Sequence, residues 1–140
     1  MDLKKIFAVS GKPGIFELKL QTRTGLLAES LLDGKNTTIG LRDNVSMLAE
    51  IAIYTAEEEV KLLEVFANIA KKENNGSAIS HAVNQNELLA YFEEVLPNYD
   101  KERVYASNIK KVVQWYNLLQ AKGNDFFDAL ATHNAEKVEE

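Results

Sequence analysis

The fold is decided by residues 10–20, which read Ser-Gly-Lys-Pro-Gly-Ile-Phe-Glu-Leu-Lys-Leu. The first five residues include two glycines and a proline. This composition is typical of a tight turn, because proline fixes one turn dihedral and glycine allows a positive φ. Apolar and charged side chains then alternate, so that Phe16, Leu18 and Leu20 share one face and Glu17 and Lys19 the other. The pattern predicts a strand that follows a hairpin turn.

Four further strands are predicted around this one. Short runs rich in apolar residues, separated by turn residues, occur at 3–9, 26–31, 37–41 and 50–55. The Asp33-Gly34 pair is a strong hairpin signal, and residues 42–49 are interpreted as a turn or one-turn helix. Five short strands with tight turns indicate a small SH3-like β-barrel, because closure removes the exposed edges that a meander would have.

Helical spacing dominates the rest of the chain. Thr55 with Glu58 fits a capping box, which predicts a helix from residue 55 to about residue 72 that closes one mouth of the barrel. Residues 74–77 read Asn-Asn-Gly-Ser and are interpreted as a linker. Two more helices are expected, one capped by Asn84 and the other by Ser107.

The predicted fold class is α+β. Residues 1–73 are expected to form the SH3-like barrel of about five strands with its capping helix. Residues 80–131 are expected to form a small helical module, and residues 132–140 a frayed tail.

Composition and charge narrow the functions that are possible. The chain has 140 residues and no cysteine, which excludes disulfides, thiolate metal sites and cysteine nucleophiles. No apolar stretch reaches the roughly 18 residues of a membrane span, and the opening lacks a signal-peptide core of roughly 7–15 apolar residues. A cytoplasmic protein without a membrane partner is therefore expected.

The charge is unevenly distributed. Residues 1–42 carry a net charge of +3, and residues 73–140 carry −5. Broad coating of nucleic acid needs a strongly basic domain, which this chain lacks. A small local site on the β module remains compatible with these charges.

Several stretches together resemble a family of small, uncharacterised bacterial proteins, in which a domain of unknown function precedes a short helical domain. They are Leu3-Lys-Lys-Ile6, Ser10-Gly-Lys-Pro-Gly14, Glu29-Ser-Leu-Leu-Asp-Gly-Lys35, Ile51-Ala-Ile-Tyr54, Val95-Leu-Pro-Asn-Tyr-Asp100 and Arg103-Val-Tyr105. The likeness covers about residues 3–120. It implies a bacterial cytoplasmic protein of two modules, and it implies no activity for any residue.

No catalytic residue, metal ligand or cofactor site is predicted. Gly11-Lys12 matches part of a phosphate-binding loop, but Pro13 removes an amide donor and the segment joins two strands. His81 and His133 are the two histidines of the chain, and their separation does not fit the i, i+4 pairs of metal-binding helices.

Five residues are candidates for binding. Lys12, Arg23, Lys35 and Arg42 are basic residues on strands or turns of the expected barrel. Trp115 is the single tryptophan and lies at the border of an apolar helical stripe, where it either seals the core edge or anchors a partner.

Three functions remain open. The leading hypothesis is a non-enzymatic protein-binding or adaptor protein that uses the Trp115 helix or the barrel loops. The alternative is binding of RNA or single-stranded nucleic acid through the basic face of the β module. The third is an enzyme with a site at the module junction, lined by Tyr54, Tyr99 and Tyr105. Oligomeric state stays open.

Overall fold

The computed structural model describes residues 2–40 and 42–139, and leaves aside the side chains of residues 135–139. The β part is a five-stranded antiparallel sheet with strand order β4-β3-β2-β1-β5. A 3₁₀ turn, η1 (Leu3–Lys5), precedes it. Its strands are β1 (Ile6–Val9), β2 (Phe16–Gln21), β3 (Gly25–Ser30), β4 (Asn36–Gly40) and β5 (Val45–Met47). Leu41, which the sequence placed in the fourth strand, lies outside the described residues.

The sheet is open, so the SH3-like barrel is not confirmed. Strands β4 and β5 form the two edges and do not pair with each other among the described residues. The predicted fifth strand instead belongs to a separate two-stranded sheet, formed by β6 (Ala52–Tyr54) and β7 (Glu59–Lys61). The physical reason is η2 (Leu48–Glu50), a 3₁₀ turn that redirects the chain before β6. The fifth strand of the sheet, β5, comes instead from residues 42–49, which were expected to form a turn or a one-turn helix.

Thr55 caps a hairpin turn rather than a helix. Its amide donates to the Glu58 carbonyl at 2.8 Å, and its hydroxyl oxygen accepts from the Glu58 amide at 2.9 Å. These bonds join β6 to β7, so α1 (Leu62–Lys72) begins seven residues later than predicted. The Thr55 hydroxyl does accept hydrogen bonds from the amides that follow it, as in a helix cap, but the chain continues into strand β7.

Three further helices complete the fold. They are α2 (Gln85–Val95), α3 (Ala106–Gln120) and α4 (Asn124–Glu139). Asn84 caps α2 as predicted, because its side chain accepts from the Glu87 amide at 2.9 Å. The start of α3 is held by Asn108, whose side chain accepts from the Tyr105 amide at 2.9 Å. Residues 132–139, for which a frayed tail was expected, belong to α4. The α+β class is thus confirmed.

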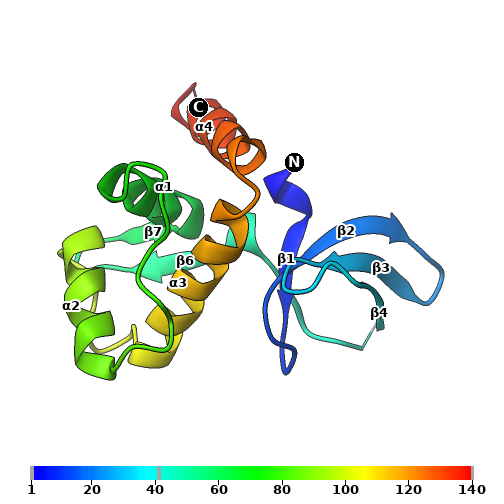
Figure 1. Cartoon of the computed structure of the whole chain (residues 1–140), viewed down its shortest axis with the longest axis horizontal. Coiled ribbons are helices and arrows are strands. Elements are labelled where there is room, and N and C mark those ends of the chain that lie inside the picture. Colours follow the sequence, from blue (N-terminus) through cyan, green and yellow to red (C-terminus); the bar gives the residue numbers. More distant parts are fainter. Residues whose placement is uncertain (1, 41, 140) are drawn as a thin grey trace.

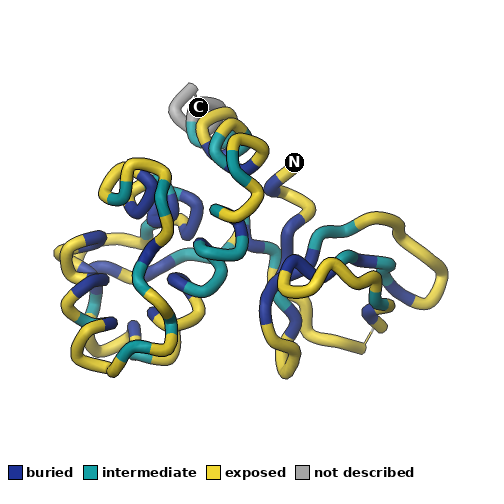
Figure 2. The backbone as a smooth tube through the Cα atoms, in the orientation of Figure 1, coloured by how far each residue is buried: buried dark blue, intermediate teal, exposed yellow. Residues whose placement is uncertain are grey.

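Figure 1 shows α3 crossing the middle of the molecule, with the five-stranded sheet on one side and β6, β7, α1 and α2 on the other. One large apolar core links the two sides. It contains Ile6 of β1 and Ile15, which directly precedes β2, as well as Phe66, Phe92 and Tyr116 from the helices. A smaller core on the sheet is built around the stacked rings of Phe7 and Phe16, whose centroids lie 5.8 Å apart. Figure 2 shows buried positions on both sides of α3, whereas the loops that project from the sheet are largely exposed.

The segment interpreted as a linker is tied to α3. The Tyr116 hydroxyl donates to the Gly76 carbonyl at 2.8 Å. The Asn117 side chain accepts from the Ala78 amide at 2.7 Å and donates to the Ile79 carbonyl at 3.2 Å. These bonds fix the path of the connection between α1 and α2.

No helix among the described residues is long and apolar enough to span a membrane.

Candidate functional site

Two adjoining cavities lie along α3. The larger, of about 650 Å³, is bounded by the β1–β2 turn and α3. The smaller, of about 240 Å³, is bounded by β6, the loop before α3, and α3 itself. Ile51, Lys111 and Trp115 line both cavities. We refer to the pair of cavities as the α3 groove.

The α3 groove combines an apolar floor with a polar rim. Ile53, Leu62 and Val112 are buried and line the smaller cavity. Trp115 is half-buried and packs against the large core. A half-buried tryptophan between two cavities gives a ligand a large, rigid apolar surface at low conformational cost. This position agrees with the border predicted for Trp115.

Three cationic side chains line the groove. Lys12 lies at the larger cavity, Arg103 at the smaller one, and Lys111 at both. Among the described residues that line either cavity, none is acidic and none is a histidine. The groove therefore has a positive lining, although the whole chain has a net charge of −5. Such a lining favours anionic groups on a ligand.

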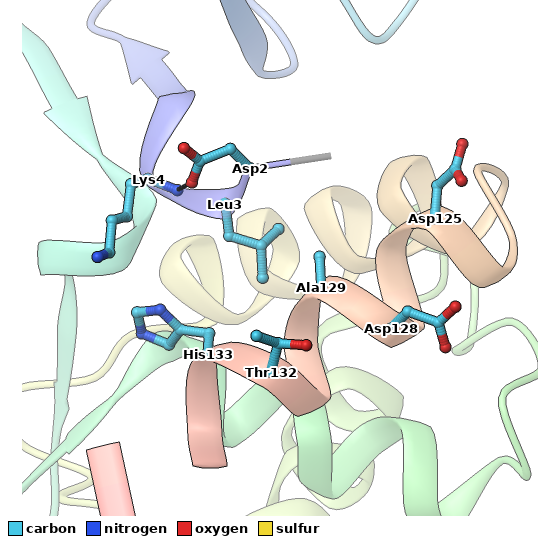
Figure 3. A pocket seen from close by; sticks show the side chains of 8 residues that line it. All are labelled: Asp2, Leu3, Lys4, Asp125, Asp128, Ala129, Thr132 and His133. Atoms are coloured by element: carbon cyan, nitrogen blue, oxygen red, sulfur yellow. Dashed lines mark hydrogen bonds between the residues drawn. The ribbon is translucent and has the colours of Figure 1, made fainter. Parts of the chain in front are cut away.

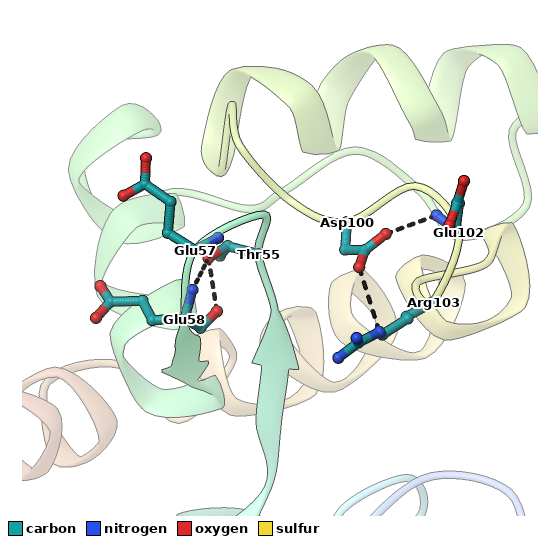
Figure 4. A network of polar contacts seen from close by, with 6 residues as sticks. All are labelled: Thr55, Glu57, Glu58, Asp100, Glu102 and Arg103. Carbon is teal, nitrogen blue, oxygen red and sulfur yellow. Dashed lines mark hydrogen bonds and ion pairs between the residues drawn. The ribbon is translucent and has the colours of Figure 1, made fainter.

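Arg103 is held in place by two contacts. Its guanidinium group lies 5.1 Å from the centre of the Tyr54 ring, and its Nε lies 3.3 Å from Asp100 Oδ2. Figure 4 shows this ion pair beside a second network, in which Thr55 joins Glu57 and Glu58. Arg103 is exposed, so the contact with one carboxylate leaves guanidinium donors free for another anion.

The β1–β2 turn carries Lys12 to the groove. Gly11 and Gly14 have φ values of 85° and 75°, which favour glycine. A Cβ at Gly14 would lie 3.6 Å from the Leu118 side chain of α3. The turn therefore approaches the helix closely, so that the exposed Lys12 lines the larger cavity together with Trp115.

The other basic candidates are not brought to this groove. Lys35 lies between β3 and β4, at the same end of the sheet as Lys12, because successive turns of a meander alternate between its two ends. Arg23 lies between β2 and β3, at the opposite end, and Arg42 follows β4. The basic face expected for nucleic acid is thus divided between two ends of the sheet.

The three tyrosines expected at the module junction do not line one cavity. Tyr54 lines the smaller cavity. Tyr99 is buried and its ring meets that of Phe92 edge-on, with the centroids 5.0 Å apart. Tyr105 is exposed and lies before α3.

A third cavity, of about 490 Å³, lies between η1 and α4 and contains His133. Figure 3 shows the carboxylates of Asp2, Asp125 and Asp128 pointing apart rather than toward one centre. In the part of the chain that the structure describes, no group of three or more histidines, cysteines or carboxylates is placed to hold a metal ion.

Two buried tyrosines have raised pKa values. Burial, followed by the nearby Glu73 carboxylate, raises the pKa of Tyr116 to about 12. Burial and a hydrogen bond to Glu73 raise the pKa of Tyr91 well above its usual range. Both hydroxyls join structural elements and neither lines the α3 groove, so these shifts affect stability rather than ligand binding.

Lys111 and Arg103 were not among the binding residues predicted from the sequence. Lys111 carries a usable signal, because it precedes Trp115 by four residues and shares its helix face. Arg103 carries none, since its position depends on the path of the 98–104 loop against β6.

Comparison with known proteins shows the family. The model of Domain of unknown function (DUF5606) matches residues 3–48, and that of Domain of unknown function (DUF6852) matches residues 51–119. A solution NMR structure from Bacteroides vulgatus, a structural genomics target, is 42% identical, with a TM-score of 0.68. The alignment covers 86% of this chain and 87% of that chain. No curated protein matches.

The chain therefore belongs to a family of bacterial proteins built from these two domains of unknown function. This confirms the resemblance seen in the sequence. The two matched domains meet at η2, the turn that separates the five-stranded sheet from the β6–β7 hairpin.

Proposed function

We propose that this protein is a non-enzymatic binding module of the bacterial cytoplasm, which holds an acidic segment of a partner protein in the α3 groove. The observation that carries the proposal is the joint lining of one groove by Trp115, Lys111 and Lys12, without an acidic residue among its described lining. An aromatic anchor with a cationic rim suits a partner that carries apolar and acidic side chains.

The groove is better suited to a peptide than to nucleic acid. A single-stranded nucleic acid needs a basic track several nucleotides long with stacking aromatics, whereas Arg23 and Arg42 lie away from the groove. A peptide needs one apolar anchor and a few charged contacts.

The test is a selection of peptides with eight randomised positions, displayed on phage, on the immobilised full chain. We expect the selected peptides to be enriched in glutamate and aspartate and to contain one aromatic or large aliphatic residue. Titration of a selected peptide that lacks tryptophan should change the fluorescence of Trp115, because the peptide covers this side chain and the chain has no other tryptophan. Affinity should fall as salt rises.

Two adjacent lysines supply a matched control. Lys110 and Lys111 are both exposed and lie on α3, but Lys111 lines the groove and Lys110 does not. Lys111→Glu should weaken binding about tenfold, since it turns an attraction into a repulsion, whereas Lys110→Glu should change it less than about twofold. Equal effects of both substitutions, or selected peptides without acidic residues, would contradict the proposal.

A further inference from the structure

Strand β6 presents a partly unpaired backbone edge to the α3 groove. In the β6–β7 hairpin, the carbonyl of Ile51 accepts from the Leu62 amide, and the amide of Thr55 donates to Glu58. Successive residues of a strand direct their backbone groups to opposite edges. The backbone groups of Ala52 and Tyr54 therefore point away from β7.

Another segment covers only one end of this edge. Thr55 forms an antiparallel bridge with Tyr99. The Asp100 amide donates to the Tyr54 carbonyl, and the Ala56 amide donates to the Asn98 carbonyl, both at 2.9 Å. Beyond this point the chain turns away, because the Asp100 carbonyl accepts from the Val104 amide at 2.9 Å.

Three backbone groups are left without a backbone partner among the described residues. They are the amide and the carbonyl of Ala52 and the amide of Tyr54. Ala52 and Tyr54 both line the smaller cavity, across which lie Val112 and Trp115 of α3. An open strand edge beside an apolar cavity is the arrangement that receives an added peptide strand.

We propose that the acidic partner segment binds as an extended strand on the free edge of β6, antiparallel to it and in line with residues 98–100. This inference rests on the proposed function and adds the mode of binding. The incoming backbone pairs with Ala52, and one of its side chains enters the cavity beside Trp115. Carboxylates two positions before or after that residue share its face of the strand and lie toward Lys111 and Arg103.

The charges beside the edge support this occupant. An open edge is normally protected by charged side chains against pairing with other strands. Arg103 and Lys111 lie at the smaller cavity on the side of α3 and its preceding loop, so they repel a basic strand and attract an acidic one. The cavity volume of about 240 Å³ suits a short stretch of peptide rather than a folded domain.

The test compares two proline substitutions in the full chain. Ala52→Pro removes an amide of the open edge and breaks no bond to β7. Lys61→Pro removes an amide of β7 that points away from β6, at a residue whose φ of −62° suits proline. We expect Ala52→Pro to weaken binding of the tightest selected peptide at least tenfold and Lys61→Pro to leave it within about twofold. Far-ultraviolet circular dichroism confirms that both variants fold.

A second measurement does not depend on substitution in the protein. The amides of Ala52 and Tyr54 should exchange rapidly with solvent in the free chain, whereas the Ile53 amide, paired with β7, should be protected. Adding the selected peptide should protect Ala52 and Tyr54. Single N-methyl groups along the peptide backbone should block binding at alternate positions, since every second amide of an added strand faces β6.

The two proposals fail in distinguishable ways. Peptides that bind with no protection of Ala52 and with equal tolerance of every N-methyl group would overturn strand addition and leave the acidic groove standing. A selection without acidic peptides would overturn the proposed function itself. A wild-type chain that forms dimers at micromolar concentration, and loses them in Ala52→Pro, would replace the partner peptide by a second copy of the chain.

Discussion

The side chain of Asn117 holds the connection between α1 and α2 in a defined path. It satisfies the amide of Ala78 at 2.7 Å and the carbonyl of Ile79 at 3.2 Å. Ala78 is buried, so removal of the Asn117 amide group leaves a buried donor unpaired. Asn117→Ala should lower the free energy of unfolding by about 1–3 kcal/mol, measured by urea denaturation.

Gln120 provides the control for this substitution. It lies three residues further along the same helix, and it bonds Asn75 and Ser77 at exposed positions. Water can replace those bonds, so Gln120→Ala should cost less than about 0.5 kcal/mol. Equal losses in the two variants would show that the buried bonds of Asn117 contribute no more than exposed ones.

The raised pKa of Tyr116 makes the free energy of unfolding fall at alkaline pH. Because its pKa is raised to about 12, the folded protein holds the phenol proton more tightly than the unfolded chain, whose tyrosines titrate near pH ~10. The stabilisation is complete below pH ~10 and is lost as the pH rises toward about 12. The raised pKa of Tyr91 acts in the same direction.

The free energy of unfolding should therefore fall between about pH 10 and 11.5 in urea denaturation series. Tyr116→Phe should make this decline shallower. It should also cost about 1 kcal/mol at neutral pH, because the Gly76 carbonyl loses its donor. A stability that is flat over this pH range in the wild-type chain would exclude the linkage.

Residue-scale prediction from the sequence succeeded where the signal was local. Trp115 could be placed at the border of its helix stripe, because helical spacing alone determines that position. That Lys12 and Trp115 line the same cavity could not be predicted, since it depends on the close approach of the β1–β2 turn to α3 at Gly14 and Leu118.

At the scale of elements, the helix predicted to start at Thr55 was wrong, because the same residue pattern can begin either a helix or a hairpin turn. A threonine followed three residues later by glutamate caps a helix in many proteins, and here it closes the hairpin between β6 and β7. The deciding contact is distant in sequence, because Tyr99 and Asp100 pair with the outer edge of β6. The strand β2 needed no such contact and was predicted correctly. Its alternation was predicted only in part, because a register shift between Leu18 and Leu20 interrupts the pairing with β3 and Leu20 is exposed.

The pairing of β3 with β4 depends on Gly25. A Cβ at this position would lie 1.9 Å from the carbonyl oxygen of Ile39, which belongs to the backbone of β4. Gly25→Ala should thus force the strands apart and cost more than about 2 kcal/mol in thermal or urea denaturation. Gly34→Ala, at a positive φ but with open space around it, should cost only about 1 kcal/mol. The reverse order of the two losses would contradict the geometry.

At the scale of the whole molecule, the two matched domains share one core. Ile6, Ile15 and Leu31 from the first domain belong to the same buried cluster as Phe66 and Val113 from the second. The larger cavity of the α3 groove also takes its lining from both domains, with Lys12 on one and Trp115 on the other. A site built in this way requires that the two domains keep a fixed relative position.

This requirement leads to a prediction about cooperativity. Because the core is continuous, the chain should unfold in a single transition, despite the boundary between the two family domains at η2. Urea denaturation followed by Trp115 fluorescence, which reports on α3, should coincide with denaturation followed by circular dichroism of the whole chain. Ile15→Ala, a substitution in the first domain, should shift both curves equally by about 2–4 kcal/mol. Two separate transitions, or a shift of the circular dichroism curve alone, would show that the domains unfold independently and that the α3 groove has no fixed shape.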